Sequence, residues 1–529
     1  MKKRVVSVLC AIAMVASMLT GCGGSDSGKK ADSSTTTAET EGGTFVQAIN
    51  SMPSSFIPNP TNDDQTSVVH PVLDRLFSET AGEKEYYLAD SVEVSEDGKT
   101  YSIHLNEKAN WSDGEPITVD DILFAIDYNS VYGGGASEYN TINGVPITFN
   151  KKDDKTLEIV LPQVFNRYMA TLATICPMPS HIFDGDATKV DDSGYFYSTD
   201  MVTSGAYTIS ELNSDSIVFK ARDDYYRGTP SVKTLVMKTT GAGSTRQVAL
   251  DNGEISYMRV TTNEELEKYE NDDNYNVYSV PEARLNYFEI NNNGPANLTL
   301  EQRKAIFMAL NQEEILDAAY GNDKLVTAAN SVFTPDQAFW SEDLKGYSQN
   351  VEEAKKIAEE TGLTEKTLIY IYNADRPNME AIATTIQQQL ATIGVKLSIE
   401  GLEASSFFQR FFAVMLFQNG QENTWDLGTN GWDSMRGTNL CQGYQYFTNE
   451  KAWGFSQDVA DAAIKVNETA DLEEAKTAAV DLHNKVMAEY WQYPLTYTNY
   501  VMISKKNVTG LDGSQVVPEF NDYLSINVE

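Results

Sequence analysis

Residues 88–127 read LADSVEVSEDGKTYSIHLNEKANWSDGEPITVDDILFAID, and this stretch carries the clearest secondary-structure signals in the chain. Apolar and polar residues alternate over 101–105, which predicts a strand with one buried face. The run at 96–99, Glu-Asp-Gly-Lys, is typical of a hairpin turn before that strand. Thr118 with Asp121 resembles a capping box, and apolar residues at helical spacing follow. The stretch therefore predicts a hairpin that leads into a helix.

The second half of the chain indicates an α/β fold. Residues 367–372 are typical of a strand, and an apolar stripe at helical spacing runs from Ile382 to Ile393. Gly394 is expected to end that helix, and residues 395–399 alternate as the next strand. The pattern predicts a β-α-β unit, for which a right-handed crossover is the default.

The N-terminus is expected to direct the chain out of the cell. Three basic residues at 2–4 precede an apolar run at 5–19 that is too short for a permanent membrane span. The run ends in Leu-Thr-Gly-Cys, which resembles a bacterial lipobox, so Cys22 is the predicted lipidation site after removal of residues 1–21. The alternative is a plain secreted protein in which Cys22 is incidental. Residues 22–42 continue as a polar, flexible linker.

Composition excludes several functional classes. A net charge of -36 argues against binding nucleic acid or anionic lipid headgroups. The four histidines show no metal-ligand spacing, and neither a metal nor another cofactor is expected. Cys176 and Cys441 remain in the folded part, either as one disulfide or as two buried thiols.

Residues 88–127 also resemble the corresponding region of family 5 of the bacterial extracellular solute-binding proteins. Further motifs that resemble this family follow in the family's order: CPMPSHI at 176–182, TSGAY at 203–207, ARDDYY at 221–226 with GTP at 228–230, and LDNGEI at 250–255. Within these motifs Gly205 and Gly253 are expected at turn positions with positive φ. The resemblance implies an α/β, two-lobed periplasmic-binding-protein-like fold (type II, cluster C) with an extra domain inserted in the first lobe.

The resemblance also implies where the boundaries between the domains lie. Lobe I is expected to combine three segments, domain II is expected to interrupt it, and lobe III is expected to be one continuous segment. The expected segments are 43–77, 196–276 and 491–529 for lobe I, 78–195 for the inserted domain II, and 277–490 for lobe III.

The function implied by the resemblance is that of the substrate-binding lipoprotein of an ABC importer, outside the cell membrane and attached to it only through lipid. It would act as a monomer that captures peptides, in particular oligopeptides, and delivers them to permease and ATPase subunits. One alternative is the same fold binding an oligosaccharide, a metal chelate or haem, and a second is a surface sensor or adhesin. A peptide hydrolase is the remaining alternative, but neither G-x-S-x-G nor H-E-x-x-H occurs, so the chain is not expected to be an enzyme.

The candidate substrate-binding residues come from two segments. Residues 425–434, WDLGTNGWDS, resemble the second-lobe strand and turn that contact ligand in peptide receptors. In those relatives an aspartate three residues after the Trp holds the peptide's α-ammonium, but Met435 occupies that position here. Either Asp433 replaces it or the ligand lacks a free amino terminus. The candidates are Asn430, Gly431, Trp432, Asp433 and Ser434, with Asp63 and Asp64 from a loop expected in the first lobe.

Each candidate has a plainer interpretation. Trp432 could be a core aromatic residue, and Asp433 could be a solvated turn residue or a cap. Asp63 and Asp64 could belong to an exposed acidic loop.

Overall fold

The computed structural model describes residues 43–58, 63–80, 83–132, 137–413, 423–433, 443–512, 520 and 523–529. Cys22, the predicted signal segment, Ser434, Met435 and Cys441 lie outside the described residues. In the described part of the chain, every helix is too short or too polar to cross a bilayer.

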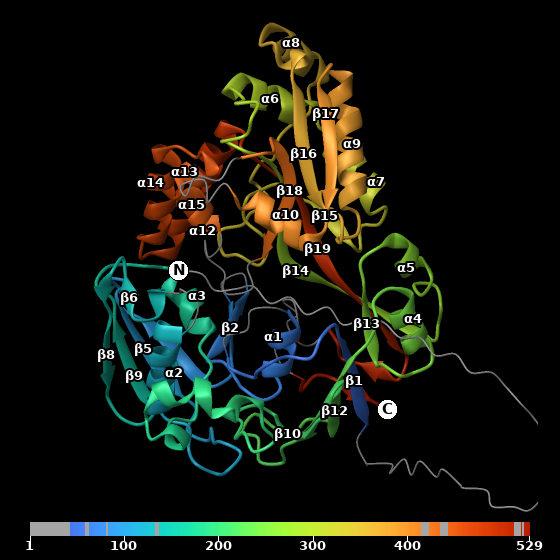
Figure 1. The fold of residues 1–529 in the computed structure, drawn as a ribbon. Helices are drawn as coiled ribbons and strands as arrows, with labels where there is room; N and C mark the ends of the chain where they lie inside the picture. Colours follow the sequence, from blue (N-terminus) through green and yellow to red (C-terminus); the bar gives the residue numbers. More distant parts are fainter. Residues whose placement is uncertain are drawn as a thin grey trace, which may run out of the picture. The chain divides into compact units, whose positions relative to one another are not determined.

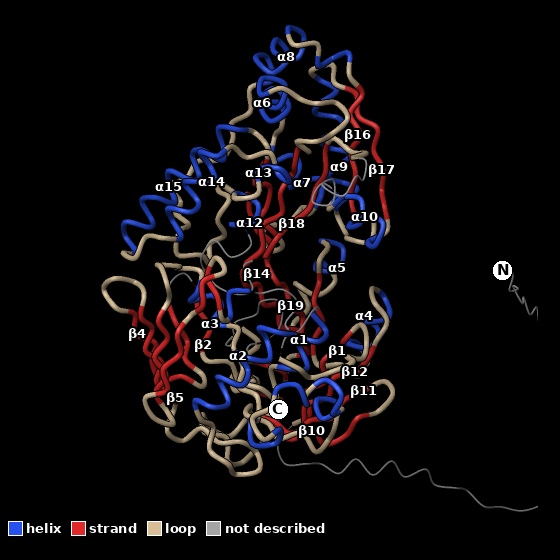
Figure 2. The backbone as a smooth tube through the Cα atoms, turned by 60° about the vertical axis from the view of Figure 1, so that its left-hand side comes forward, coloured by secondary structure: helices blue, strands red, loops and turns tan. Residues whose placement is uncertain are grey.

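The first sheet has four strands in the order β1-β12-β11-β10 (Figure 1 and Figure 2). Its strands are β1 (Thr44–Ile49), β10 (Tyr207–Leu212), β11 (Ser216–Ala221) and β12 (Thr234–Thr239). β1 runs parallel to β12, whereas the other two pairings are antiparallel. More than 150 residues of sequence therefore separate β1 from the other strands of its sheet, and a second sheet forms within that interval.

The second sheet contains the predicted hairpin and has the order β4-β5-β9-β8. Its strands are β4 (Ala89–Val94), β5 (Thr100–Leu105), β8 (Thr148–Lys151) and β9 (Thr156–Val160), and α2 (Val119–Tyr132) follows the hairpin. Burial alternates along β5, and Gly98 in the turn has a φ of 69°. The Asp121 carboxylate accepts the backbone N–H of Thr118 at 2.9 Å. The predicted hairpin and helix are confirmed. Of the two hydrogen bonds of a capping box, this is the one in which the third residue of the box accepts the backbone N–H of the first.

The third sheet is the largest described and has seven strands, in the order β13-β19-β14-β18-β16-β17 with β15 on β19 (Figure 1). Its strands are β13 (Tyr257–Val260), β14 (Tyr275–Ile290), β15 (Val326–Ala328), β16 (Thr367–Asn373), β17 (Lys396–Leu402), β18 (Leu427–Asp433) and β19 (Gln492–Lys505). β16 and β17 are parallel and α9 (Met379–Thr392) connects them. The stripe from Ile382 to Ile393 is buried and Gly394 has a φ of 80°. The predicted β-α-β unit is confirmed.

The remaining elements cover these sheets or connect them. The other helices are α1 (Asp63–Val69), α3 (Tyr168–Ala173), α4 (Ser244–Asp251), α5 (Asn263–Glu267), α6 (Leu300–Ala309), α7 (Gln312–Ala319), α8 (Val351–Glu360), α10 (Ala404–Phe411), α12 (Gly443–Phe447), α13 (Glu450–Trp453), α14 (Gln457–Asn467) and α15 (Leu472–Glu489). The short strands are β2 (Phe77–Thr80), β3 (Glu83–Tyr86), β6 (Thr141–Ile142), β7 (Val145–Pro146), β20 (Val508–Thr509) and β21 (Asn527–Val528).

Buried apolar side chains form three clusters, called here the first, second and third core. The first core joins the two four-stranded sheets and also contains residues near the C-terminus, such as Tyr523 and Ile526. The second and third cores lie on opposite faces of the seven-stranded sheet, because Phe288 belongs to the second and its neighbour Tyr287 to the third. Successive residues of a strand point to opposite faces, so β14 supplies both cores.

β14 and β19 are long paired strands, and β14 is interrupted by a bulge. Their register shifts between Pro281 and Arg284, and Ala283 between them has a φ of 55°. A bulge of this kind bends a strand and increases its twist.

The expected lobe boundary at 276/277 falls inside β14, and the boundary at 490/491 falls just before β19.

Gly253 has the predicted positive φ, at 77°, but the same prediction for Gly205 is wrong. A Cβ atom at position 205 would lie 2.5 Å from the carbonyl oxygen of Pro71. The backbone N–H of Gly205 donates to the Val72 carbonyl at 3.0 Å. Glycine is therefore required there by the close approach of another backbone segment rather than by a left-handed turn.

Candidate functional site

The predicted binding residues 430–433 lie on β18, which pairs antiparallel with β14. Gly431 lies opposite Asn286, and Asp433 lies opposite Arg284. On its other side β18 pairs with β16 only at residues 427 and 428. Within the described residues, the remainder of β18 is thus hydrogen-bonded on the β14 side alone. A strand edge of this kind can accept an additional extended chain.

Trp432 packs inside a group of aromatic rings in the third core. Its ring centroid lies 5.2 Å from that of Tyr287, 4.8 Å from Tyr446 and 6.0 Å from Phe447. Only 5% of Trp432 is exposed, as is 5% of Asn430. A direct ligand contact for these two residues stays a prediction.

Asp63 and Asp64 begin α1, and their part in ligand binding also stays a prediction. Asp426, in the same segment as β18, is a structural carboxylate. It accepts the backbone N–H groups of Ala296 at 2.7 Å and Ile369 at 2.9 Å. Burial raises the pKa of Asp426 even though these hydrogen bonds favour its charged form.

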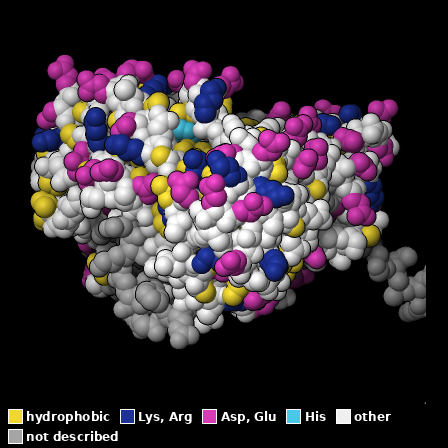
Figure 3. Space-filling model, turned by 90° about the horizontal axis from the view of Figure 1, so that it is seen from above, with side chains coloured by type: hydrophobic (Ala, Val, Ile, Leu, Met, Phe, Trp, Pro, Cys, Tyr) yellow, Lys and Arg dark blue, Asp and Glu magenta, His cyan; other side chains and the backbone are white. Residues whose placement is uncertain are grey.

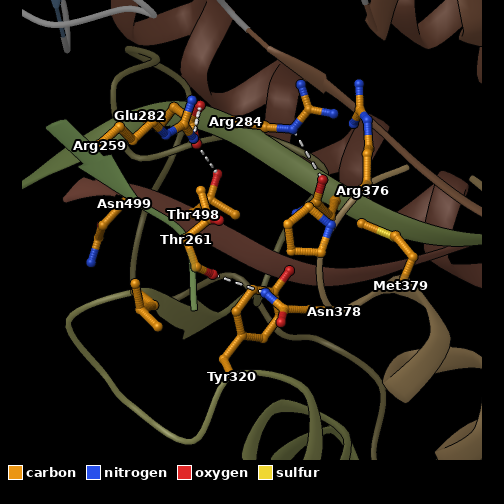
Figure 4. A pocket seen from close by; sticks show the side chains of 13 residues that line it. Arg259, Thr261, Glu282, Arg284, Tyr320, Arg376, Asn378, Met379, Thr498 and Asn499 are labelled. Atoms are coloured by element: carbon orange, nitrogen blue, oxygen red, sulfur yellow. Dashed lines mark hydrogen bonds and ion pairs between the residues drawn. The ribbon is translucent and has the colours of Figure 1, made fainter. Parts of the chain in front are cut away.

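A cavity of about 270 Å³ is lined in part by Glu282, Arg284 and Asn286 of β14, and Figure 4 shows its lining. This volume is close to the lower end of the roughly 300–1,000 Å³ found for small-molecule sites. The lining residues come from β13 and the residue after it, β14, the connection between α7 and β15, the start of α9 with the residues before it, and β19: Arg259, Thr261, Glu282, Arg284, Asn286, Tyr320, Leu325, Arg376, Pro377, Asn378, Met379, Thr498 and Asn499.

One end of the cavity is organised around Glu282. An Nη atom of Arg259 lies 2.5 Å from one carboxylate oxygen of Glu282, and the Thr498 hydroxyl donates to the other oxygen at 2.7 Å. The Arg259 guanidinium also lies over the ring of Tyr500, 4.4 Å from its centroid. These contacts fix Glu282 and Arg259 in place, since each charged group has several partners.

The other end of the cavity holds Arg284 and Arg376, whose side chains extend in the same direction in Figure 4. The Nε–H of Arg284 donates to Asn286 Oδ1 at 3.1 Å, and the Asn286 amide donates to the Thr496 hydroxyl at 3.1 Å. Three guanidinium groups and one carboxylate therefore line the cavity, which makes its lining cationic in a chain with a net charge of -36. Such a lining favours an anionic ligand group.

Gly431 connects the predicted segment with this cavity. A Cβ atom at position 431 would lie 2.8 Å from an Nη atom of Arg284 and 2.8 Å from the carbonyl oxygen of Leu285, and it would also collide with Asn286 Oδ1. The absence of a side chain at Gly431 thus leaves room for two of the residues that line the cavity.

The structure also bears on the cysteine and metal expectations. Cys176 is a free, buried thiol, and burial raises its pKa to about 12, so it is a poor nucleophile. In the described ranges, no group of histidine, cysteine and acidic side chains is arranged to hold a metal ion.

Sequence patterns did not predict the three arginines of the cavity. Arg259, Arg284 and Arg376 are isolated in sequence and follow no spacing rule. The sequence offered one indication of their importance, namely that they are basic in a chain with 40 basic residues against 76 acidic ones. A basic residue in so acidic a chain is a candidate for a specific role, but only the fold brings these three together.

Comparison with known proteins establishes the family. A model described as bacterial extracellular solute-binding proteins, family 5 middle, matches residues 85–454. The chain therefore belongs to family 5 of the bacterial extracellular solute-binding proteins.

Individual relatives agree with this assignment. The chain is 26% identical to the dipeptide-binding protein of Escherichia coli K12, over 75% of this chain and 78% of that protein. The structure of the ABC transporter substrate-binding protein CtaP from Listeria monocytogenes matches with a TM-score of 0.83 and 25% identity, covering 92% of this chain and 100% of that one. A putative peptide-binding protein, AppA from Clostridium difficile, matches at 0.81 with 26% identity and the same coverage. The expected two-lobed fold is confirmed.

Proposed function

We propose that this protein captures peptides between its two lobes and delivers them to the permease and ATPase subunits of an ABC importer. The observation that carries the proposal is the cationic cavity beside the partly unpaired strand β18. The peptide-binding names of two of the relatives support the same ligand class. Catalysis is not part of the proposal, because a solute receptor works by differential binding of its closed state.

The strand and the cavity suit different parts of one peptide. The edge of β18 can pair with the main chain of an extended peptide, which is independent of peptide sequence. Arg284 and Arg376 can hold a carboxylate through charge-assisted hydrogen bonds, and guanidinium groups match carboxylate geometry. The peptide would therefore lie along β18 with a carboxylate, at its C-terminus or on an acidic side chain, in the cavity.

The remaining sequence-based assignments are part of the same proposal. Cys22 would carry the lipid that holds a monomeric receptor on the outer face of the membrane. Lobe I would comprise 43–77, 196–276 and 491–529, with domain II at 78–195 and lobe III at 277–490. Acidic side chains are spread over the face seen in Figure 3, with basic ones scattered between them, which suits a soluble receptor that binds no nucleic acid.

Titration calorimetry of the ligand-free protein tests this function. We expect heats of binding for di- to hexapeptides, and none for oligosaccharides, nickel chelates or haem. The peptides should be recovered intact, because no hydrolysis is expected. If the protein binds a sugar, a chelate or haem and binds no peptide, the proposed ligand class is wrong. If the peptides are cleaved, the protein is an enzyme.

The role of Asp433 as the anchor of the peptide's α-ammonium has its own test. We expect Asp433→Ala to weaken binding of peptides with free amino termini about tenfold, because one charge-assisted hydrogen bond is lost. Binding of N-acetylated peptides should change little. Equal losses for free and acetylated peptides would remove Asp433 as the anchor, and calorimetry on the two peptide forms measures this directly.

A further inference from the structure

Two parts of the molecule with separate apolar cores, called here the two bodies, meet through a contact that contains several hydrogen bonds. Residues 163–167 follow β9, and Phe165 among them is buried in the first core. Helix α14 packs in the third core through Val459 and Val466. These two segments are about 300 residues apart in sequence, yet the end of α14 lies directly against residues 163–167.

The contact consists of hydrogen bonds donated by one segment to the other. The Asn166 side-chain amide donates to the carbonyl oxygens of Val466 at 3.0 Å and Thr469 at 2.5 Å. The Asn166 backbone N–H donates to the carbonyl oxygen of Asn467 at 2.8 Å. Two further hydrogen bonds cross between the segments. The Arg167 backbone N–H donates to the side-chain oxygen of Asn467 at 3.1 Å, and the Gln163 side-chain amide donates to the Glu468 carboxylate at 2.7 Å.

Two of the acceptors are carbonyl groups that a helix leaves without partners at its C-terminus. α14 ends at Asn467, so the carbonyl oxygens of Val466 and Asn467 lack donors within the helix. Asn166 thus caps a helix of the other body. In water these carbonyls would be solvated, so breaking their hydrogen bonds to Asn166 leaves neither carbonyl without a partner.

A buried arginine supports the same contact. Arg167 is 5% exposed, and its guanidinium lies 3.2 Å from the Glu138 carboxylate and 4.9 Å from the centre of the Tyr444 ring. Burial raises the pKa of Glu138, and Arg167 opposes that shift. Glu138 belongs to the same body as Arg167, whereas Tyr444 is on α12 beside the third core. The guanidinium is therefore held by one body and stacks on an aromatic ring of the other.

We propose that residues 163–167 and the C-terminal end of α14 form a latch that closes when the two lobes close and that slows release of the bound solute. This proposal rests on the proposed function, because it assumes that the lobes close around a ligand. The bulge in β14 at Ala283 gives the connecting strands a place to bend. A contact that forms after the ligand has entered stabilises only the closed state, so it acts on dissociation more than on association.

The latch is tested by comparing Asn166→Ala with Asn150→Ala. Asn150 donates to Glu158 at 3.0 Å within the second sheet, so the control removes an asparagine hydrogen bond that does not cross between the bodies. Stopped-flow measurements with a peptide that binds the wild type should show about tenfold faster dissociation for Asn166→Ala, with an unchanged association rate. Asn150→Ala should match the wild type. Equal dissociation rates for Asn166→Ala and the wild type would overturn the latch while leaving peptide binding intact.

A second measurement does not depend on the ligand. Gln163→Cys combined with Glu468→Cys places thiols where two side chains now meet, and a short bifunctional thiol reagent should join them within one molecule. Each single-cysteine variant serves as the control. Cross-linking in a protein that binds no peptide would support the latch and overturn the ligand assignment. Absence of cross-linking, with and without a solute that binds, would overturn the latch.

Discussion

Replacing Arg284 and Arg376 together by alanine is expected to weaken binding of peptides with a free carboxylate by about a hundredfold or more. Each guanidinium can supply a charge-assisted hydrogen bond worth roughly 1.5–3 kcal/mol, and ten-fold in affinity corresponds to about 1.4 kcal/mol. Both side chains line the same end of the cavity, so their effects are expected to combine. Titration calorimetry with one peptide on both proteins gives the ratio of dissociation constants.

Two controls make this result specific. Arg246→Ala removes a guanidinium that is hydrogen-bonded to Asn50 and does not line the cavity, so it should leave affinity unchanged. A peptide without any carboxylate, amidated at its C-terminus, should bind the wild type as weakly as the free peptide binds the double variant. The assignment of the cavity fails if the double variant weakens both peptide forms by the same factor.

Glu289→Gln is expected to make stability less dependent on pH. Glu289 is 4% exposed, and among the described residues its Oε2 atom has no hydrogen-bond partner. It lies on β14 opposite Gly428 and Gln492, and the amide atoms of Gln492 also lack described partners. Burial raises the pKa of Glu289 well above its usual 4.5, because the charged form is poorly solvated there.

The sign of the effect follows from this raised pKa. Below pH 4.5 Glu289 is protonated in both the folded and the unfolded chain and contributes no pH dependence. Above pH 4.5 the unfolded chain ionises while the folded chain stays protonated, so the free energy of unfolding falls by up to about 1.4 kcal/mol per pH unit. The fall stops once pH exceeds the folded pKa. Glutamine does not titrate, so the variant should gain stability over the wild type as pH rises.

Urea unfolding of both proteins between pH 4 and pH 9 measures this difference. Burial also raises the pKa values of the neighbouring Tyr287 and Tyr446, so those groups stay neutral over this range. Thr208→Ala, at a position on β10 that carries no ionisable side chain, should give a constant difference from the wild type across the series. A constant difference for Glu289→Gln as well would show that Glu289 does not titrate between the two states.

The sequence was most informative where local rules act alone. The hairpin at β4 and β5 and the unit formed by β16, α9 and β17 follow from alternation, helical spacing and turn residues, all of which operate within a few residues. The positive φ of Gly253 was predictable for the same reason. Gly205 was not, because the backbone that crowds it comes from Pro71, more than 130 residues away in sequence.

The candidate site was only partly predictable. Sequence pattern singled out residues 430–433, and the structure places their strand next to Arg284 and Asn286 of the cavity. The cavity itself depends on β13, β14, β19 and the start of α9 coming together, which is a tertiary event without a local signature. Trp432 illustrates the same limit, since its packing against Tyr287 and Tyr446 depends on elements far apart in the chain.

The first core has a consequence for the order of events during synthesis. It begins with Phe45 and is completed by Tyr500, Met502, Tyr523 and Ile526, so the earliest and the latest residues of the globular part share one interior. The first core cannot acquire its finished interior until residues 500–526 have emerged. A chain that stops short of Tyr500 would leave apolar residues of the first sheet, such as Phe45 and Tyr207, without their C-terminal partners, and we expect such fragments to be substrates for proteases and chaperones.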